Sequence, residues 1–96
     1  MKKLHQQLVS VVMPVYNAGD YLVAALDSIL HQTYSNFEFI IVDDASTDSS
    51  WKILKAYAAQ HENMRIFRNT TNRGVSETVK RAISKAKGDY LARMDA

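Results

Sequence analysis

The sequence contains no cysteine, and its 96 residues include only one proline and three glycines. The lack of cysteine excludes disulfides, thiolate catalysis and cysteine-ligated zinc, and it fits a reducing compartment, so we expect a cytoplasmic location. No apolar run is long enough to span a membrane, and the polar residues after Met1 do not form the apolar core of a secretory signal. Membrane association of a longer parent protein is left open.

Neither sign of charge dominates, because twelve basic and ten acidic residues give a formal net charge of +2. These residues are scattered along the sequence, so no basic stripe suited to a phosphate backbone is expected and nucleic acid is not an expected partner. A hydrophobic share of 47% is typical of a packed globular protein. The length allows a single domain, residues 1–96, with a small core.

Four short apolar segments alternate with three segments whose apolar residues recur at helical spacing. The predicted strands are Leu8–Val15, Phe37–Asp44, Met64–Asn69 and Asp89–Met94, and the predicted helices are Tyr21–Gln32, a helix that starts after Asp48, and Val75–Ala86. This alternation predicts an α/β fold of order βαβαβαβ, a doubly wound open parallel sheet with helices on both faces. Ligands bind such sheets at the carboxyl ends of the strands.

Several residues are expected to mark element boundaries. Pro14 lacks a backbone donor, so we expect the first strand to stop there, and Gly88 is expected to end the third helix in a left-handed conformation. Side-chain oxygens within Ser46–Asp48 are expected to cap the second helix. Trp51 lies at a helical core position and is predicted to pack in the core, so Tyr16 is the better candidate for stacking on a ligand.

The loop after the first strand is Pro14-Val15-Tyr16-Asn17, which has no resemblance to a G-x-G-x-x-G turn, and the sequence contains no P-loop. Dinucleotide and P-loop phosphate cradles are therefore disfavoured.

The second strand ends in Asp43 and Asp44, whose charges are costly there unless a ligand N–H, a cation or backbone amides bind them. On spacing alone these interpretations stay open, and the pattern around Asp95, after the last strand, is typical of an ordinary loop aspartate. His5, His31 and His61 share no metal-ligand spacing and are assigned no chemistry.

Four blocks, VSVVMPVYNAGDYLVAALDSILHQTY, FEFIIVDDASTDSS, NRG and GDYLARMDA, resemble in this order the N-terminal half of the family 2 glycosyltransferases, inverting enzymes of the GT-A fold. The resemblance covers Val9–Ala96 and implies a Rossmann-like half that binds the donor nucleotide sugar. It implies nucleotide-binding roles for Pro14, Val15, Tyr16, Asn17, Asp43, Asp44 and Arg73. Asp44 would accept the N3–H of uracil, which favours a UDP-sugar donor. Asp95 would open a partial D-x-D motif for Mn2+ or Mg2+.

In that family the catalytic base and the site for a carbohydrate or lipid-linked acceptor lie in the half that follows, so no catalytic residue is assigned. We therefore expect this chain to be inactive by itself and to self-associate through the face that further strands would cover. The Arg-Asn pair that family members often carry near Val79 and Lys80 is absent. The alternative is a small doubly wound nucleotide-binding or signalling module without transferase activity. A receiver module would need an aspartate where Arg68-Asn69 end the third strand.

Overall fold

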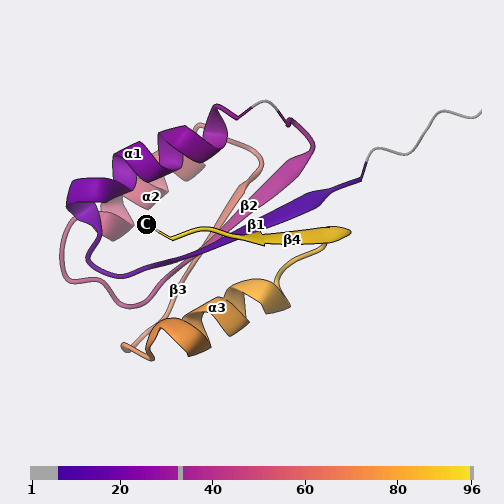
Figure 1. Cartoon of the computed structure of the whole chain (residues 1–96). Helices are drawn as coiled ribbons and strands as arrows, with labels where there is room; N and C mark the ends of the chain where they lie inside the picture. Colours follow the sequence, from indigo (N-terminus) through magenta and orange to yellow (C-terminus); the bar gives the residue numbers. More distant parts are fainter. Residues whose placement is uncertain (1–6, 33, 96) are drawn as a thin grey trace, which may run out of the picture.

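The computed structural model describes residues 7–32 and 34–95, which form a single parallel sheet flanked by helices (Figure 1). The elements follow one another as β1 Val9–Val15, α1 Gly19–Leu30, β2 Phe37–Asp43, α2 Ser50–Ala58, β3 Met64–Arg68, α3 Val75–Ser84 and β4 Tyr90–Arg93. The predicted βαβαβαβ order and the doubly wound class are confirmed. Most predicted boundaries agree within two residues, and α1 starts and ends two residues earlier than predicted.

The four strands lie in the order β3-β2-β1-β4, and all neighbouring pairs are parallel. The chain moves outward from β1 through β2 to β3 and then crosses back, so that β4 pairs with the other side of β1. This reversal of direction between β1 and β4 is the topological switch point, where open α/β sheets place their ligands.

Two hydrophobic clusters hold helices against the two faces of the sheet. The larger cluster joins α1 and α2 to one face through buried residues that include Met13, Phe39, Leu22 and Leu54. The smaller cluster joins α3 to the other face and includes Val12, Ile40, Val42 and Ala82. Figure 1 shows the same division, with α1 and α2 on one side of the sheet and α3 on the other. β2 is buried at every position, as its continuous apolar run predicts.

Pro14 does not end β1, which is a correction to the prediction. It lies inside the strand opposite Val42, and the strand continues to Val15. The carbonyl oxygen of Val12 accepts a hydrogen bond from Met94 N, which follows β4, so Val12 turns its backbone polar groups toward the β4 side of β1. Residues two apart in a strand have the same orientation, so the nitrogen of Pro14 also faces the β4 side. The pairing of β1 with β4 extends only from Val9 to Val12, so the missing donor of Pro14 costs no ladder hydrogen bond.

Gly88 is not in a left-handed conformation, so the prediction that it ends α3 in that way is wrong. Its small size is required instead by a close approach, because a Cβ atom at Gly88 would lie 2.7 Å from Leu8 O and 2.5 Å from Ser10 Oγ. The Gly88 N–H donates to Ser10 Oγ, which in turn donates to the buried Glu38 carboxylate at 2.6 Å. This network fixes the start of β4 against β1 and β2.

The remaining boundary predictions have mixed outcomes. Among the proposed caps of α2, only Asp48 acts at the helix start, where Oδ1 accepts from Ser50 N at 2.9 Å. Trp51 is half-buried and packs against the larger hydrophobic cluster, as predicted. Ser46 serves the strand end instead, as described below.

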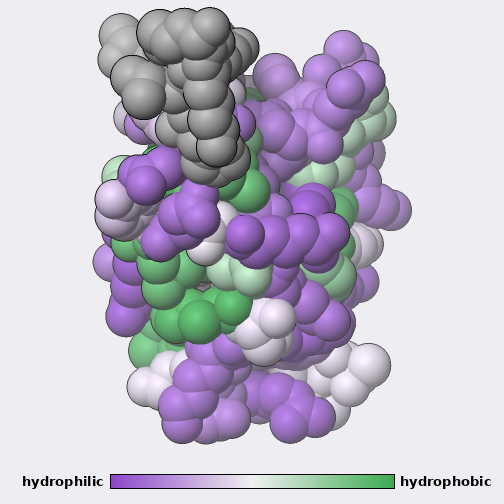
Figure 2. Space-filling view, turned by 90° about the vertical axis from the view of Figure 1, so that its right-hand side faces the viewer, coloured by the Kyte–Doolittle hydropathy of each residue, from purple (hydrophilic) through white to green (hydrophobic). Residues whose placement is uncertain are grey.

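Polar residues cover most of the surface seen from the side in Figure 2, with hydrophobic residues gathered in patches between them. β4 is an edge strand, and Tyr90 and Leu91 on it are exposed. Within residues 7–32 and 34–95, no helix is long and apolar enough to cross a membrane.

Candidate functional site

A cleft of about 370 Å³ opens at the carboxyl ends of β1, β2 and β4, beside the switch point. We call it the switch-point cleft, and its lining residues are Pro14, Val15, Tyr16, Asp44, Asn72, Gly74, Val75, Thr78 and Asp95. The fold thus brings together five residues that were predicted from separate segments: Pro14, Val15 and Tyr16 at the end of β1 and just after it, Asp44 after β2, and Asp95 after β4. Tyr16 is 52% exposed and can offer its ring to a ligand.

The carboxylate of Asp44 accepts three hydrogen bonds within the cleft. Its Oδ1 accepts from Asn69 Nδ2 and from Arg73 N, both at 2.8 Å, and its Oδ2 accepts from Gly74 N at 2.9 Å. The Gly74 backbone has φ 91° and ψ 162°, a region that essentially only glycine occupies. The loop between β3 and α3 is therefore shaped around this carboxylate.

The charge of Asp44 is stabilised although the residue is only 3% exposed. Burial raises the pKa of the carboxyl, but the hydrogen bonds from the Asn69 amide and the two backbone amides outweigh it, so the pKa lies below the ordinary value. The Thr78 hydroxyl also lies beside the carboxylate and lowers its pKa, but it donates its hydrogen to Gly74 O at 2.8 Å. A carboxylate offers about four acceptor positions, so the three bonds from Asn69, Arg73 and Gly74 leave one position on Oδ2. Asp44 can therefore accept one further N–H from a ligand in the cleft.

Asp43 does not line the cleft, and its contacts give it a structural role. It is fully buried, and its two oxygens accept from Ser46 N at 3.0 Å and Ser46 Oγ at 2.5 Å. Arg68 Nε lies 3.4 Å from Oδ2, and the Arg68 guanidinium stacks over the Trp51 ring. Asp43 thus binds neighbouring backbone and side-chain donors, and it folds the residues after β2 into the turn that positions Asp44.

Asn17 also supports the cleft from outside it. Its Oδ1 accepts from Thr47 N at 2.8 Å and Asp48 N at 3.3 Å, and its own N–H donates to Ser46 Oγ at 2.9 Å. Its φ of 48° is left-handed, which asparagine tolerates better than most residues. Asn17 therefore ties the loop after β1 to the loop after β2.

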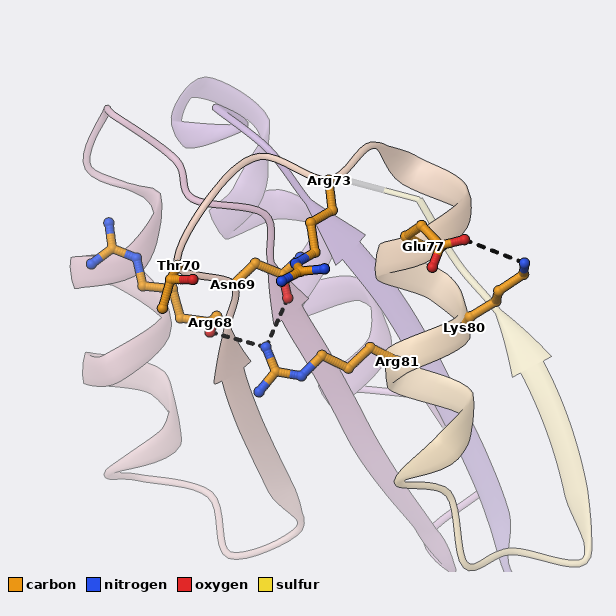
Figure 3. A pocket seen from close by; sticks show the side chains of 7 residues that line it. All are labelled: Arg68, Asn69, Thr70, Arg73, Glu77, Lys80 and Arg81. Atoms are coloured by element: carbon orange, nitrogen blue, oxygen red, sulfur yellow. Dashed lines mark hydrogen bonds and ion pairs between the residues drawn. The ribbon is translucent and has the colours of Figure 1, made fainter.

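Arg73 contributes its backbone amide to Asp44, but its side chain does not line the switch-point cleft. It faces a second hollow of about 460 Å³ on the other side of the 72–74 segment (Figure 3). We call this hollow the basic pocket, and it is lined by Arg68, Asn69, Thr70, Arg73, Glu77, Lys80 and Arg81.

Asp95 is exposed and lies 3.3 Å from Arg93 Nη2. Across residues 7–32 and 34–95, no group of three or more histidine, aspartate or glutamate side chains lies close enough to hold a metal ion. The predicted metal-binding role of Asp95 therefore stays a prediction. His31 and His61 stand apart, with His61 stacked on Tyr57, and His5 lies outside the described residues.

The residues that the sequence analysis missed are Asn69 and Thr78. Asn69 is 3% exposed, and its amide donates to Asp44 Oδ1 and to Thr78 Oγ1. A usable signal existed, because Asn69 is the last residue of a predicted strand, as Asp44 is, and the carboxyl ends of parallel strands meet at one edge of the sheet. Nothing in the helical pattern distinguished Thr78, which faces inward from the first turns of α3.

Among curated proteins, the chain is 42% identical over 90 residues to the glycosyltransferase GlyG of Streptococcus pneumoniae serotype 4 (strain ATCC BAA-334 / TIGR4). That match covers 94% of this chain and 30% of GlyG, so the chain spans about a third of the relative's length or less.

Two solved structures share the fold. A mannosyltransferase, PcManGT from Pyrobaculum calidifontis, in complex with GDP-Man and Mn2+, has a TM-score of 0.87 and 27% identity, over 95% of this chain and 28% of that one. S. aureus TarS 1-349 in complex with UDP-GlcNAc has a TM-score of 0.84 and 30% identity, over 91% of this chain and 26% of that one. The predicted Rossmann-like part of a GT-A fold is confirmed by these neighbours. Residues 10–96 match the family described as "Glycosyl transferase family 2", and the chain belongs to that family.

Proposed function

We propose that this chain forms the donor-binding part of an inverting glycosyltransferase that moves a sugar from a nucleotide sugar to a carbohydrate or lipid-linked acceptor. The observation that carries the proposal is the switch-point cleft, where the buried Asp44 carboxylate keeps one acceptor position beside the exposed ring of Tyr16. Membership of the family and the nucleotide sugars bound to the two structural neighbours support the same proposal.

We favour a uridine nucleotide as the donor. A charged carboxylate can accept the N3–H that uracil carries, whereas cytosine presents a bare acceptor nitrogen at that position and would be repelled. The lowered pKa of Asp44 keeps the group ionised at neutral pH. The neighbours bind a guanosine and a uridine sugar, so the choice of base is a question for experiment.

We further propose that the complete enzyme uses Mn2+ or Mg2+, with Asp95 among the ligands. Such a cation would neutralise charge on the leaving diphosphate. Asp95 lines the same cleft as Asp44, and one neighbour was solved with Mn2+, which supports the assignment. Because Asp95 is the one carboxylate of this chain that we propose as a metal ligand, we expect any metal binding by this chain alone to be weak.

A calorimetric titration tests the nucleotide proposal, with UDP, CDP and GDP each added in the presence of Mn2+. We expect UDP to bind more tightly than CDP by about tenfold, which corresponds to one charge-assisted hydrogen bond of roughly 1.5 kcal/mol. Tyr16→Ala should weaken UDP binding, while Tyr21→Ala removes another exposed tyrosine, which does not line the cleft, and serves as the control. Equal affinities for UDP and CDP would contradict the role of Asp44.

We also propose that the 96-residue chain has no transferase activity by itself, since it offers a partial metal site and no assigned base. An assay of donor consumption across acceptor mixtures tests this, and sustained sugar transfer by the pure chain would refute it.

Self-association through β4 is a separate proposal, supported by the exposed Leu91 and Tyr90 on this edge strand. Sedimentation velocity should show a concentration-dependent oligomer that Leu91→Lys reduces and Val23→Lys, on exposed α1 surface, does not. A monomer at every concentration would argue against it.

A further inference from the structure

The basic pocket holds more positive than negative charge, and ion pairs among the described residues involve only two of its cations, Arg68 and Lys80. Four cationic side chains, Arg68, Arg73, Lys80 and Arg81, line it together with a single carboxylate, Glu77. The chain as a whole carries a formal net charge of only +2, so this concentration of positive charge on one surface is local. A hollow of about 460 Å³ is large enough for a phosphate group and part of the molecule that bears it.

Arg73 supplies the least committed cation of the pocket. No hydrogen bond or ion pair joins its guanidinium to another residue in the parts of the chain that the structure describes. In Figure 3 the side chain extends from the loop before α3 toward Asn69 and Arg81, so it lines the hollow while remaining exposed to solvent. Its planar set of N–H donors matches the oxygens of a phosphate.

The Arg81 guanidinium is held in place by hydrogen bonds to residues at the end of β3. One nitrogen, Nη1, donates to Arg68 O at 3.0 Å and to Asn69 Oδ1 at 2.7 Å, and the guanidinium lies over the Phe67 ring. These contacts fix the group at the floor of the pocket and leave its other N–H donors unassigned. A pre-positioned guanidinium loses little conformational entropy when an anion binds.

The remaining residues that line the pocket can adjust their positions when a ligand binds. Lys80 pairs with Glu77 at 3.3 Å, but both side chains are well exposed, so this ion pair contributes little and can open. Thr70 adds a hydroxyl group at the rim. Arg68 turns away from the others in Figure 3, toward Trp51, and adds charge without a direct contact.

From this arrangement we propose that the basic pocket is a second binding site, distinct from the switch-point cleft, for a phosphate group. Arg73 and Arg81 would bind its oxygens, and Lys80 would close over it. The segment 72–74 separates the two sites, since Asn72 and Gly74 line the cleft while Arg73 faces the pocket. The Asn69 amide connects them, because it accepts from Arg81 and donates to Asp44.

Titration of the 96-residue chain with inorganic phosphate, followed by backbone amide NMR shifts, tests the site. We expect the largest amide shift changes within residues 69–81 and an affinity for phosphate that falls as salt is added. The double variant Arg73→Gln/Lys80→Gln should weaken phosphate binding by about tenfold. The matched control Lys52→Gln/Lys55→Gln removes two exposed charges from α2 and should change binding less than about twofold.

Both variants replace exposed side chains, and circular dichroism verifies that each remains folded. Equal weakening in the two variants, or no shifts within 69–81, would overturn the proposal. A repeat in saturating UDP separates it from the nucleotide proposal: phosphate that still binds supports a distinct site, and phosphate displaced by UDP refutes one.

A last arm identifies the source of the phosphate. Vesicles containing phosphatidylglycerol that bind the chain, but not the Arg73→Gln/Lys80→Gln variant, would indicate a lipid headgroup. If vesicles fail to bind while inorganic phosphate does, the ligand is a soluble phosphate ester, and the site stands in either case.

Discussion

Replacing Asp44 by asparagine is the sharpest test of how the site is built. The asparagine side chain would keep one oxygen, which can still accept from Asn69 Nδ2 and Arg73 N. Its NH2 group would replace Oδ2, the oxygen that accepts from Gly74 N. At the position of Oδ2 the Gly74 N–H would then meet a donor instead of an acceptor.

The cost of Asp44→Asn follows from these contacts. One buried N–H left without an acceptor costs about 1–3 kcal/mol. The two bonds to Oδ1 become neutral and lose about half their strength, which adds roughly 1–2 kcal/mol. We therefore expect the free energy of unfolding to fall by about 3 kcal/mol at pH 7, a large part of the 5–15 kcal/mol typical of a domain.

Urea denaturation at several pH values measures this loss. The folded-state pKa of Asp44 lies below its ordinary value of 3.8, so the wild-type protein holds this stabilisation above pH 3.8 and loses it as the pH falls further. The difference between wild type and Asp44→Asn should therefore shrink in acid. Asp48→Asn is the control, because Asp48 also accepts from two backbone amides but is exposed. A loss below about 1 kcal/mol for Asp44→Asn, or equal to that of the control, would refute the reasoning.

Three further changes test contacts that hold the fold together, two at the amino ends of the strands and one, Gly74, in the cleft. Glu38→Gln should lower the free energy of unfolding by about 2 kcal/mol in urea denaturation at pH 7, because the carboxylate accepts from Ser10, Lys87 N and Arg65. Burial raises the Glu38 pKa but these bonds lower it below the ordinary 4.5, so the wild-type advantage should fade as the pH drops below 4.5. Gly88→Ala should cost about 2 kcal/mol in thermal unfolding because its Cβ would meet backbone atoms of Leu8 and Ser10, and an unchanged Tm would contradict the close approach. Gly74→Ala should cost a similar amount, about 2 kcal/mol, through its φ of 91° alone, since no atom lies within 4 Å of the added methyl group.

The fold class could be predicted from local patterns in the sequence. Parallel strands buried on both faces consist of continuous apolar runs, as in Phe37–Asp43, and helices carry apolar residues at a period of 3.6, so both signals are local. The sequence also indicated that Asp44 and Asp95 belong to one edge of the sheet, because both follow parallel strands. The structure places both in the switch-point cleft.

The contacts that each of these residues makes could not be predicted in this way. The donors to Asp44 come from residues 69, 73 and 74, and the side chain of Arg73 turns to the far side of its own segment, into the basic pocket. Pro14 is tolerated inside β1 because β4 pairs only with Val9–Val12, and Gly88 is small because Ser10 lies against it. The contacts of Asp44, β1 with β4, and Gly88 share one physical reason, because each joins residues far apart in the chain. Strand order and register bring such residues together, and no short stretch of sequence encodes them.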